Sequence, residues 1–338
     1  MIETLTIGAR GSPLSLAQTQ AVAQELTLRH PDLRVVVRPI ATGGDDLLAQ
    51  PKKLGLKGLF VREIEKALLA GEIDLAVHSA KDLPIKLPKG LALGPTPARG
   101  PAEDALVAAE ALTLAELPKG SLVGTSSLRR KAQLLASRPD LEVAPVRGNL
   151  GTRLAKLKRG DFAALVLAEA GLARLNLSEW PRGLLDPVAF TPAPGQGALA
   201  LETRADDSRT LSLLAPLNHP DSALALALER GAAEALGLGC ETPAAAYARP
   251  EGAGFRLAAM VARTDGGVRV YRETFVEAES LKGSLAAARV EGLNLGQAVL
   301  RAGGAAILAE LAEEAAGPKP LTDSAAAPSG HPFASHDR

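Results

Sequence analysis

The sequence has few of the residues that mark metal, disulfide or nucleic-acid-binding proteins. Its 338 residues include one cysteine, Cys240, and five histidines, so an intramolecular disulfide is excluded and no metal-ligand spacing appears. Aromatic residues make up only 3% of the chain, which argues against base stacking. The 38 basic and 38 acidic residues cancel, so no general affinity for polyanions is expected. We expect no metal, no nucleic-acid partner and a reducing compartment.

The chain also lacks a long apolar run. Residues 1–10 have neither a basic start nor an extended apolar segment, and no stretch approaches the roughly 18 apolar residues of a membrane span. We therefore expect a cytoplasmic protein without a membrane partner. With 46% hydrophobic residues, the chain can bury a sizeable core, and its length predicts two or three domains.

The pattern along the chain is typical of α/β domains. Short β-like runs at 4–7, 33–40 and 74–77 alternate with helical patterns at 15–29 and 59–70. The second helical pattern places Phe60, Ile64, Ala67 and Leu68 on one apolar stripe, and Gly71 follows where a left-handed C-cap is expected. This part of the sequence predicts parallel α/β units.

Two loop-rich crossings divide the chain. The α/β rhythm restarts after the Pro/Gly-containing stretch 95–101, and a second crossing at 191–197 leads into the apolar run 198–201. A return of the chain to the first lobe there would give a hinge of two segments. The predicted fold class is α/β, with two periplasmic-binding-protein-like lobes, a hinge and a small C-terminal α+β domain. The expected divisions are 1–97 with 198–216 (domain 1), 102–191 (domain 2), 220–315 (domain 3) and a disordered tail, 317–338.

Basic residues concentrate in one part of this neutral chain. Residues 121–159 hold nine basic side chains against two acidic ones, a surplus of seven. Arg129 and Arg130 stand where a helix should begin, which is the unfavourable end of the helix dipole for a cation. An anion would offset that cost, so the placement favours a carboxylate or phosphate site, and a solvated basic face is the alternative.

Three further segments are candidates for chemistry. Ser12 is placed to cap a helix after Arg10, which makes a second anion-ready terminus. Lys81 and Asp82 follow a strand at the sheet edge where α/β proteins bind ligands, although an Asp before Leu-Pro is commonly a turn residue. Cys240 lies in a glycine-flanked loop, either as a nucleophile or attachment point or as a small buried hydrophobe.

Taken together, these motifs closely resemble the hydroxymethylbilane synthase family, also called porphobilinogen deaminases. They span roughly residues 1–315 in the family's order, and the tail lies outside the resemblance. The motifs are Arg10-Gly11-Ser12, Lys57-Gly58-Leu59-Phe60, His78-Ser79-Ala80-Lys81-Asp82-Leu83-Pro84, Gly124-Thr125-Ser126-Ser127-Leu128-Arg129-Arg130, Arg147-Gly148-Asn149, Pro194-Gly195-Gln196-Gly197-Ala198 and Gly239-Cys240.

The resemblance implies a transferase of porphyrin and heme biosynthesis that deaminates four porphobilinogen molecules and joins them into linear hydroxymethylbilane. It implies a dipyrromethane cofactor on Cys240, a monomer, and Asp82 assisting ammonia loss. The implied catalytic residues are Asp82, Lys81 and Arg10. Cofactor-binding residues are Cys240 (covalent attachment), Lys81, Asp82, Thr125, Ser127, Arg129, Arg130, Arg147 and Gly148. Substrate-binding residues are Arg10, Ser12, Phe60, Ser79, Arg147, Arg153, Arg174 and Gln196, and no metal is implied.

The main alternative is a two-lobed solute-binding or ligand-sensing module, because one fold can serve many functions. A third domain and the cysteine Cys240 favour the enzyme. Each porphobilinogen carries two carboxylates, so a chain growing at one site demands the local basic surplus that residues 121–159 provide.

Overall fold

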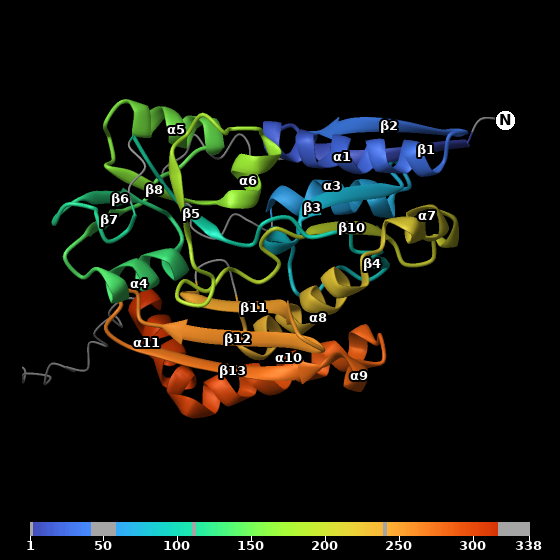
Figure 1. Ribbon diagram of the computed structural model, residues 1–338. Coiled ribbons are helices and arrows are strands. Elements are labelled where there is room, and N and C mark those ends of the chain that lie inside the picture. The colour runs from blue at the N-terminus through green and yellow to red at the C-terminus, as the bar shows by residue number, and fades with distance from the viewer. Residues whose placement is uncertain (1–2, 42–58, 110–112, 239–241, 317–338) are drawn as a thin grey trace, which may run out of the picture.

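The computed structural model describes residues 3–41, 59–109, 113–238 and 242–316, and within them the chain forms three β-sheets (Figure 1). The first sheet has the order β2-β1-β3-β10-β4, the second β7-β6-β8-β5-β9 and the third β11-β12-β13. In Figure 1 the third sheet lies below the other two, which stand side by side. The predicted fold class, two α/β lobes plus a small α+β domain, is confirmed.

The first sheet is built from the N-terminal segment and a later return of the chain. Its strands are β1 (Glu3–Arg10), β2 (Leu33–Ile40), β3 (Leu75–Ser79), β4 (Leu91–Leu93) and β10 (Leu199–Arg204), with helices α1 (Pro13–Arg29), α3 (Leu59–Leu69) and α7 (Ser208–Leu214) and the short turns η2 (Ala80–Asp82) and η3 (Ala215–Leu217). In α3, Ile64, Ala67 and Leu68 are buried and Gly71 has φ +71°, as the apolar stripe and C-cap predicted. The return of the chain at β10 is confirmed by its pairing with β3 and β4.

The second sheet has the same design. Its strands are β5 (Asp104–Ala108), β6 (Leu122–Gly124), β7 (Glu142–Ala144), β8 (Ala164–Ala168) and β9 (Arg182–Leu185), and its helices are α4 (Leu128–Ser137), α5 (Leu150–Lys158) and α6 (Glu169–Arg174). The parallel units predicted from the N-terminal segment are confirmed, because β1 pairs in parallel with both β2 and β3. The strands that follow the crossings, β5 and β10, run antiparallel to their neighbours because each enters its sheet from the opposite lobe.

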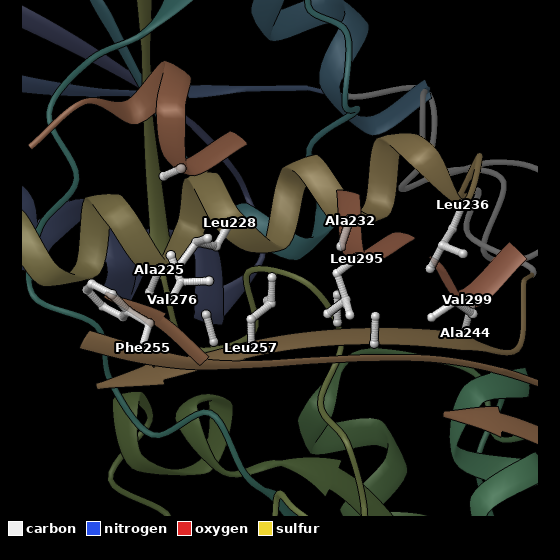
Figure 2. Packing of buried hydrophobic residues seen from close by; sticks show 14 of the residues in the cluster. Ala225, Leu228, Ala232, Leu236, Ala244, Phe255, Leu257, Val276, Leu295 and Val299 are labelled. Carbon is white, nitrogen blue, oxygen red and sulfur yellow. The ribbon is translucent and has the colours of Figure 1, made fainter. Parts of the chain in front are cut away.

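The third unit is a β-meander covered by helices. It comprises β11 (Ala244–Glu251), β12 (Gly254–Ala262) and β13 (Arg269–Glu277), with α8 (Pro220–Ala235), α9 (Ala278–Leu281), α10 (Leu285–Val299), the π-turn η4 (Leu300–Gly304) and α11 (Ala305–Ala316). Its core joins α8, α10 and the sheet through Leu228, Phe255 and Leu295 (Figure 2). Helices α8 and α10 approach closely at Gly231 and Gly292, because a Cβ on either would meet the backbone of the other helix.

One helical stretch passes a length-and-composition test for a membrane span. Residues Leu285–Glu314 satisfy it, although no uninterrupted apolar run was expected there. The stretch is bent at Gly303, where φ is +111°, and Ala288, Leu295 and Val299 on it are buried in the core of the third unit. The stretch is therefore two helices, α10 and α11, separated by a bend, and each contributes buried residues to the core of the third unit. The tail at 317–338, for which disorder was predicted, lies outside the described residues.

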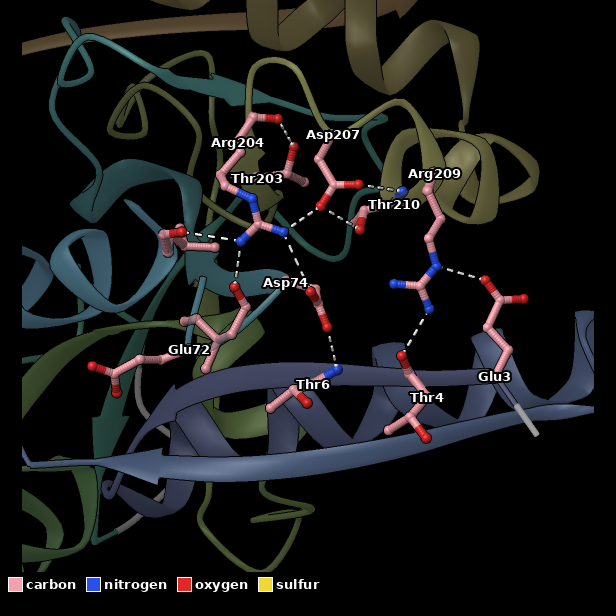
Figure 3. Close-up of polar contacts among 12 residues, drawn as sticks. Glu3, Thr4, Thr6, Glu72, Asp74, Thr203, Arg204, Asp207, Arg209 and Thr210 are labelled. Atoms are coloured by element: carbon pink, nitrogen blue, oxygen red, sulfur yellow. Dashed lines mark hydrogen bonds and ion pairs between the residues drawn. The ribbon is translucent and has the colours of Figure 1, made fainter. Parts of the chain in front are cut away.

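The end of the first sheet farthest from the predicted site is held by arginines (Figure 3). Arg204 donates to the carbonyls of Leu68 and Ile73 at 3.0 and 2.8 Å and pairs with Asp74 at 3.3 Å. The other oxygen of Asp74 accepts from the backbone N–H of Thr6 at 2.8 Å. These bonds fix α3, β1, β3 and β10 together, so the opposite edge, where β1 and β3 end, is presented by a rigid sheet.

Candidate active site

The predicted acid–base segment lies where β3 leaves the first sheet. β3 ends at Ser79, and Lys81 and Asp82 occupy the short turn η2, half-buried. The backbone N–H of Ala80 donates to the carbonyl of Ala198 at 3.0 Å, which ties the turn to the start of β10. On the other side, Gln18 Nε2 donates to Ser79 Oγ at 2.8 Å. The turn is thus held by hydrogen bonds from both of its neighbours.

The helix cap predicted in the first lobe forms at Ser12. β1 ends at Arg10 on the same sheet edge as Ser79, because β1 and β3 are parallel. Ser12 caps α1 by accepting from the backbone N–H of Ser15 at 3.3 Å, and Ser15 Oγ accepts from the backbone N–H of Arg10 at 3.2 Å. The strand end and the helix start are therefore locked to each other, with Gln18 one turn further along α1.

In the second sheet, hydroxyl groups and arginines meet at the start of α4. Ser127 is the N-cap and accepts from the backbone N–H of Arg130 at 3.4 Å, while Thr125 Oγ1 accepts from the backbone N–H of Ser127 at 3.2 Å. Thr125 is buried, and Arg129 and Arg130 are only 4% and 7% exposed. The solvated-face alternative is therefore wrong for these two arginines.

One anion beside Arg129 and Arg130 is a carboxylate of the protein itself. Asp104, the fully buried first residue of β5, lies with Oδ2 2.7 Å from Arg129 Nη1 and Oδ1 2.7 Å from Arg130 Nη2. Burial would raise the pKa of Asp104, but the two guanidinium charges outweigh it and hold that pKa well below its ordinary value. Because one carboxylate pairs with two guanidinium groups, the group formed by Asp104, Arg129 and Arg130 keeps a net positive charge. Arg129 Nε has no hydrogen-bond partner among the described residues.

Asp104 was not identified from the sequence. The one available signal was its position as the only charged residue of an otherwise apolar strand that follows a crossing. A carboxylate at the start of a fully buried strand needs a cationic partner, because an unpaired buried charge is costly. Arg129 and Arg130 stand 25 and 26 residues further along the chain.

The second basic terminus is at α5. Asn149 caps this helix by accepting from the backbone N–H of Thr152 at 2.9 Å. Gly148 has φ +110°, and a Cβ there would meet the Thr152 side chain, so glycine is required. Arg147 is exposed, whereas Arg153 is half-buried and donates to the Gly148 carbonyl at 2.9 Å.

The charge of Asp82 connects this terminus to the turn after β3. Burial lowers the pKa of Arg153, the charge of Arg130 lowers it further, and the charge of Asp82 raises it. Arg153 of the second lobe is thus within electrostatic reach of Asp82 in the first.

Gln196 lies at the centre of the predicted residues and is fully buried. Its Oε1 accepts from Lys81 Nζ at 3.4 Å, and its Nε2 donates to the Ala102 carbonyl at 2.7 Å and to Asp104 Oδ1 at 2.9 Å. Both ends of its amide are occupied by protein groups. Gln196 therefore links the turn that carries Lys81 and Asp82 to the carboxylate that pairs with the α4 arginines.

Both crossing segments, 95–101 and 191–197, are held by arginine hydrogen bonds near Gln196. Arg174, at the end of α6, donates to the Gly197 carbonyl at 2.6 Å, and burial lowers its pKa. Arg99 Nε donates to the Gln196 carbonyl at 2.8 Å, and its guanidinium forms a two-point ion pair with buried Glu229 of α8. Neither Arg99 nor Glu229 was identified from the sequence.

Several predicted residues lie outside the described part. Cys240 is among residues 239–241, the motif residues Lys57 and Gly58 fall in 42–58, and the side chain of Phe60 is not described. Among the residues that the structure does describe, no group of three His, Cys, Asp or Glu side chains could hold a metal ion.

The fold and this site define a two-lobed α/β protein in which an acid-bearing turn of one lobe lies within electrostatic reach of an arginine-rich region of the other. Similarity to known proteins narrows the class. The family described as porphobilinogen deaminase, dipyrromethane cofactor binding domain, matches residues 5–212. This chain belongs to the porphobilinogen deaminase family.

Curated relatives agree along almost the whole chain. A porphobilinogen deaminase of Roseiflexus castenholzii is 47% identical over 310 residues, which cover 91% of this chain and 100% of the relative. One from Syntrophotalea carbinolica is 46% identical over 308 residues, covering 91% and 96%. The chain is therefore a transferase of tetrapyrrole biosynthesis with hydroxymethylbilane synthase activity, porphobilinogen as substrate and dipyrromethane as cofactor. The expectations for family, reaction and cofactor are confirmed.

Solved structures resemble the chain only distantly. An OxyR2 regulatory domain from Vibrio vulnificus aligns with a TM-score of 0.39 at 16% identity, over 64% of this chain and 93% of its own. A probable amino-acid ABC transporter extracellular-binding protein, ytmK from Bacillus subtilis, aligns with a TM-score of 0.41 at 12% identity, over 64% and 90%.

Proposed function

We propose that Asp82 is the proton-transfer group of the reaction and that the α4 and α5 arginines bind the carboxylates of the cofactor and the growing chain. The observation that carries this proposal is the linkage of the two regions. Lys81 and the Asp104–Arg129–Arg130 group share Gln196, and Arg153 lies within the electrostatic reach of Asp82.

The residues present fit a polycarboxylate cofactor. Arg129 has an unused buried Nε–H, the α4 group keeps a net positive charge after pairing with Asp104, and Arg147 is exposed. Thr125 and Ser127 add hydroxyl donors at the start of α4. Such charge-assisted contacts are strong, because arginine can bind a carboxylate through two parallel hydrogen bonds. We propose that these residues, with Gly148 and Lys81, hold the dipyrromethane.

When bound, the dipyrromethane would supply the electron-rich pyrrole to which the first porphobilinogen is joined, and each later unit would be joined to the end of the growing chain. Asp82 holds a proton at the aminomethyl nitrogen of the substrate, so that nitrogen leaves as neutral ammonia and its bonding electrons stay on nitrogen. The ionised Asp82 then stabilises the cation left on the substrate. Arg10, Ser12, Ser79, Phe60 and Arg174 orient the incoming unit, and Lys81 binds a carboxylate beside it.

Replacing Asp82 tests this assignment. Asp82→Asn removes the charge while keeping size, so we expect a folded protein that loads cofactor and loses roughly 3 to 5 kcal/mol of transition-state stabilisation in kcat. Asp32→Asn, in the exposed turn before β2, is the matched control and should leave the rate unchanged. A loss below about tenfold in Asp82→Asn would mean that another group moves the proton.

We propose Cys240 as the point of covalent attachment, since it is the only thiol of the chain and stands in the Gly239-Cys240 motif. Intact-mass measurement of protein expressed in porphobilinogen-producing cells should show the mass of two attached pyrrole units. Cys240→Ser should have the apo mass and no activity. An apo mass in the native protein, or full activity in the serine variant, rejects the assignment.

The arginines are best tested at α5. Arg147→Leu and Arg153→Leu should weaken carboxylate binding by about 2 to 5 kcal/mol where the partner is left buried and unpaired. Replacing Arg129 or Arg130 gives a less direct test, because either change also removes a counter-charge of buried Asp104. Normal cofactor loading and kinetics in the two α5 variants would contradict the proposal.

We further propose that the protein acts as a cytoplasmic monomer without a nucleic-acid or membrane partner, on the support of its balanced charge and low aromatic content. The domain divisions proposed are those of the sequence: 1–97 with 198–216, 102–191, and 220–315. Sedimentation at several concentrations tests the monomer, and a mass above that of one chain at all of them rejects it.

A further inference from the structure

A group of buried titratable side chains lies behind the catalytic turn and has no part in the chemistry above. His78 immediately precedes Ser79 on β3, and Glu202 lies beside it on β10 with Oε2 3.0 Å from His78 Nε2. Glu65 of α3 is buried as well and lies within electrostatic reach of both His78 and Glu202. Their exposed fractions are 7%, 0% and 7% for His78, Glu202 and Glu65. These three residues are called the β3–α3 cluster.

The cluster is surrounded by apolar packing. Alternate residues of β3 point to α3, where Ala76 packs with Ile64 and Leu68. Just beyond, Ala80 of the catalytic turn packs with Val61 of the same helix. A change of charge between α3 and β3 therefore acts on the interface that supports Lys81 and Asp82.

The cluster has more acceptor oxygens than donors. Glu202 Oε1 and Glu65 Oε1 are both buried and have no hydrogen-bond partner among the described residues. Burial and then the negative charge of Glu202 raise the pKa of Glu65, and these effects outweigh the opposing influence of His78 and Arg62. A proton on Glu65 removes one of two like charges in an apolar interface.

Other charged groups border the cluster on each packed element. On α3, Arg62 is exposed and Glu63 is half-buried. On α8, Arg230 is influenced by the charge of Glu202 and donates to the carbonyls of Pro84 and Ile85 at 2.8 Å each. Arg230 is therefore bound to the loop after the catalytic turn.

We propose that Glu65, His78 and Glu202 form a proton-holding cluster that positions the Ser79–Asp82 turn, with the proton on Glu65 keeping α3 packed against β3. The inference rests on the proposed role of Asp82. Because the native state favours protonated Glu65, this contribution to stability is complete below the ordinary carboxyl pKa. It is lost as pH rises through the raised native pKa. The turn, and with it the rate, loses its support over the same interval.

The protonation is measured directly by carboxyl-carbon NMR of the cofactor-loaded protein labelled at the glutamate δ-carbon. The Glu65 signal is assigned as the one missing in Glu65→Gln. We expect it to titrate at higher pH than the signals of exposed glutamates, and titration together with them would overturn the inference. This readout does not depend on activity.

The positioning role is measured by pH profiles of kcat and KM. Glu65→Gln mimics the protonated form, so its rate should persist to higher pH than that of the native protein. Glu72→Gln, an exposed control just after α3 that pairs with Arg38, should keep the native profile. Superimposable profiles for native protein and Glu65→Gln would refute the role.

The pair of substitutions at His78 separates donor loss from packing. His78→Leu leaves Glu202 without its donor and should lower kcat by about tenfold or more with KM little changed, whereas His78→Gln supplies an N–H and should recover most of the rate. Equal loss of kcat in both variants rejects the hydrogen-bonding role.

The results for Asp82 and Glu65 distinguish the two proposals. If Asp82→Asn stays active while Glu65 titrates at higher pH than the exposed glutamates, the proposed function fails and the cluster stands. If Glu65 titrates with the exposed glutamates while Asp82→Asn is inactive, the cluster fails and the proposed function stands.

Discussion

Asp104 offers the sharpest test of how the second lobe is held together. Its carboxylate is fully buried between Arg129 and Arg130, which are themselves 4% and 7% exposed. Asp104→Asn keeps the shape and one acceptor oxygen but removes the charge, so two guanidinium groups remain buried without a counter-charge. Removing one partner of a buried ion pair costs about 3 to 5 kcal/mol. We expect a loss in that range, which corresponds to a fall in melting temperature on the order of 10 °C.

The chain supplies its own reporter for this measurement. Its only tryptophan, Trp180, packs against the core of the second sheet, so urea unfolding followed by Trp180 fluorescence monitors this lobe. Asp161→Asn is the control, because Asp161 also pairs with an arginine of this lobe, Arg159, but both side chains are exposed. Its effect should be small.

The pH dependence gives an independent check of the same reasoning. The pKa of Asp104 is lower in the native protein than in the unfolded chain, so its contribution to stability is present above the ordinary Asp value of about 4. It is lost as pH falls through the native value, and Asp104→Asn lacks it throughout. The gap between native protein and variant should therefore narrow in acid. A loss under about 1 kcal/mol at neutral pH would refute the account.

Three further outcomes follow from the packing and capping. Gly292→Val should cost on the order of 3 kcal/mol in thermal unfolding, because a side chain there meets the Leu228 carbonyl across the α8–α10 contact. Ser127→Ala should cost about 1 kcal/mol by removing the α4 cap, with weaker cofactor retention detected by intact mass. Glu229→Gln should destabilise the protein by about 3 to 5 kcal/mol in urea unfolding, because Arg99 loses its buried counter-charge.

Local signals made much of the fold predictable. The helix at α3 was visible because its apolar stripe and Gly71 lie within one short segment. Strand direction was not predictable in the same way. Nothing within β5 or β10 states which way a strand runs, since that follows from where each crossing enters its sheet.

The charged core of the site escaped prediction because pairing across the fold is not a local property. Counting residues 121–159 gave a surplus of seven, yet the acid that partly neutralises Arg129 and Arg130 lies outside that window, at Asp104. Glu229 is still farther from Arg99 in sequence. The helix starts and their caps could be placed from sequence, whereas the partner of each arginine depends on which strands become neighbours.

The two crossings connect the lobes covalently, and their hydrogen bonds constrain how the lobes can move. Glu229 accepts from Arg99 and from the backbone N–H groups of Gly195 and Ala248, so it holds both crossings against the third sheet. At Gly197, where φ is +85°, a Cβ would collide with the backbone of the other crossing. A sliding motion of the lobes would break these contacts and leave Glu229 as an uncompensated buried charge. A rotation about the crossings preserves them, so relative movement of the lobes should turn about this point, with Gln196 beside the axis.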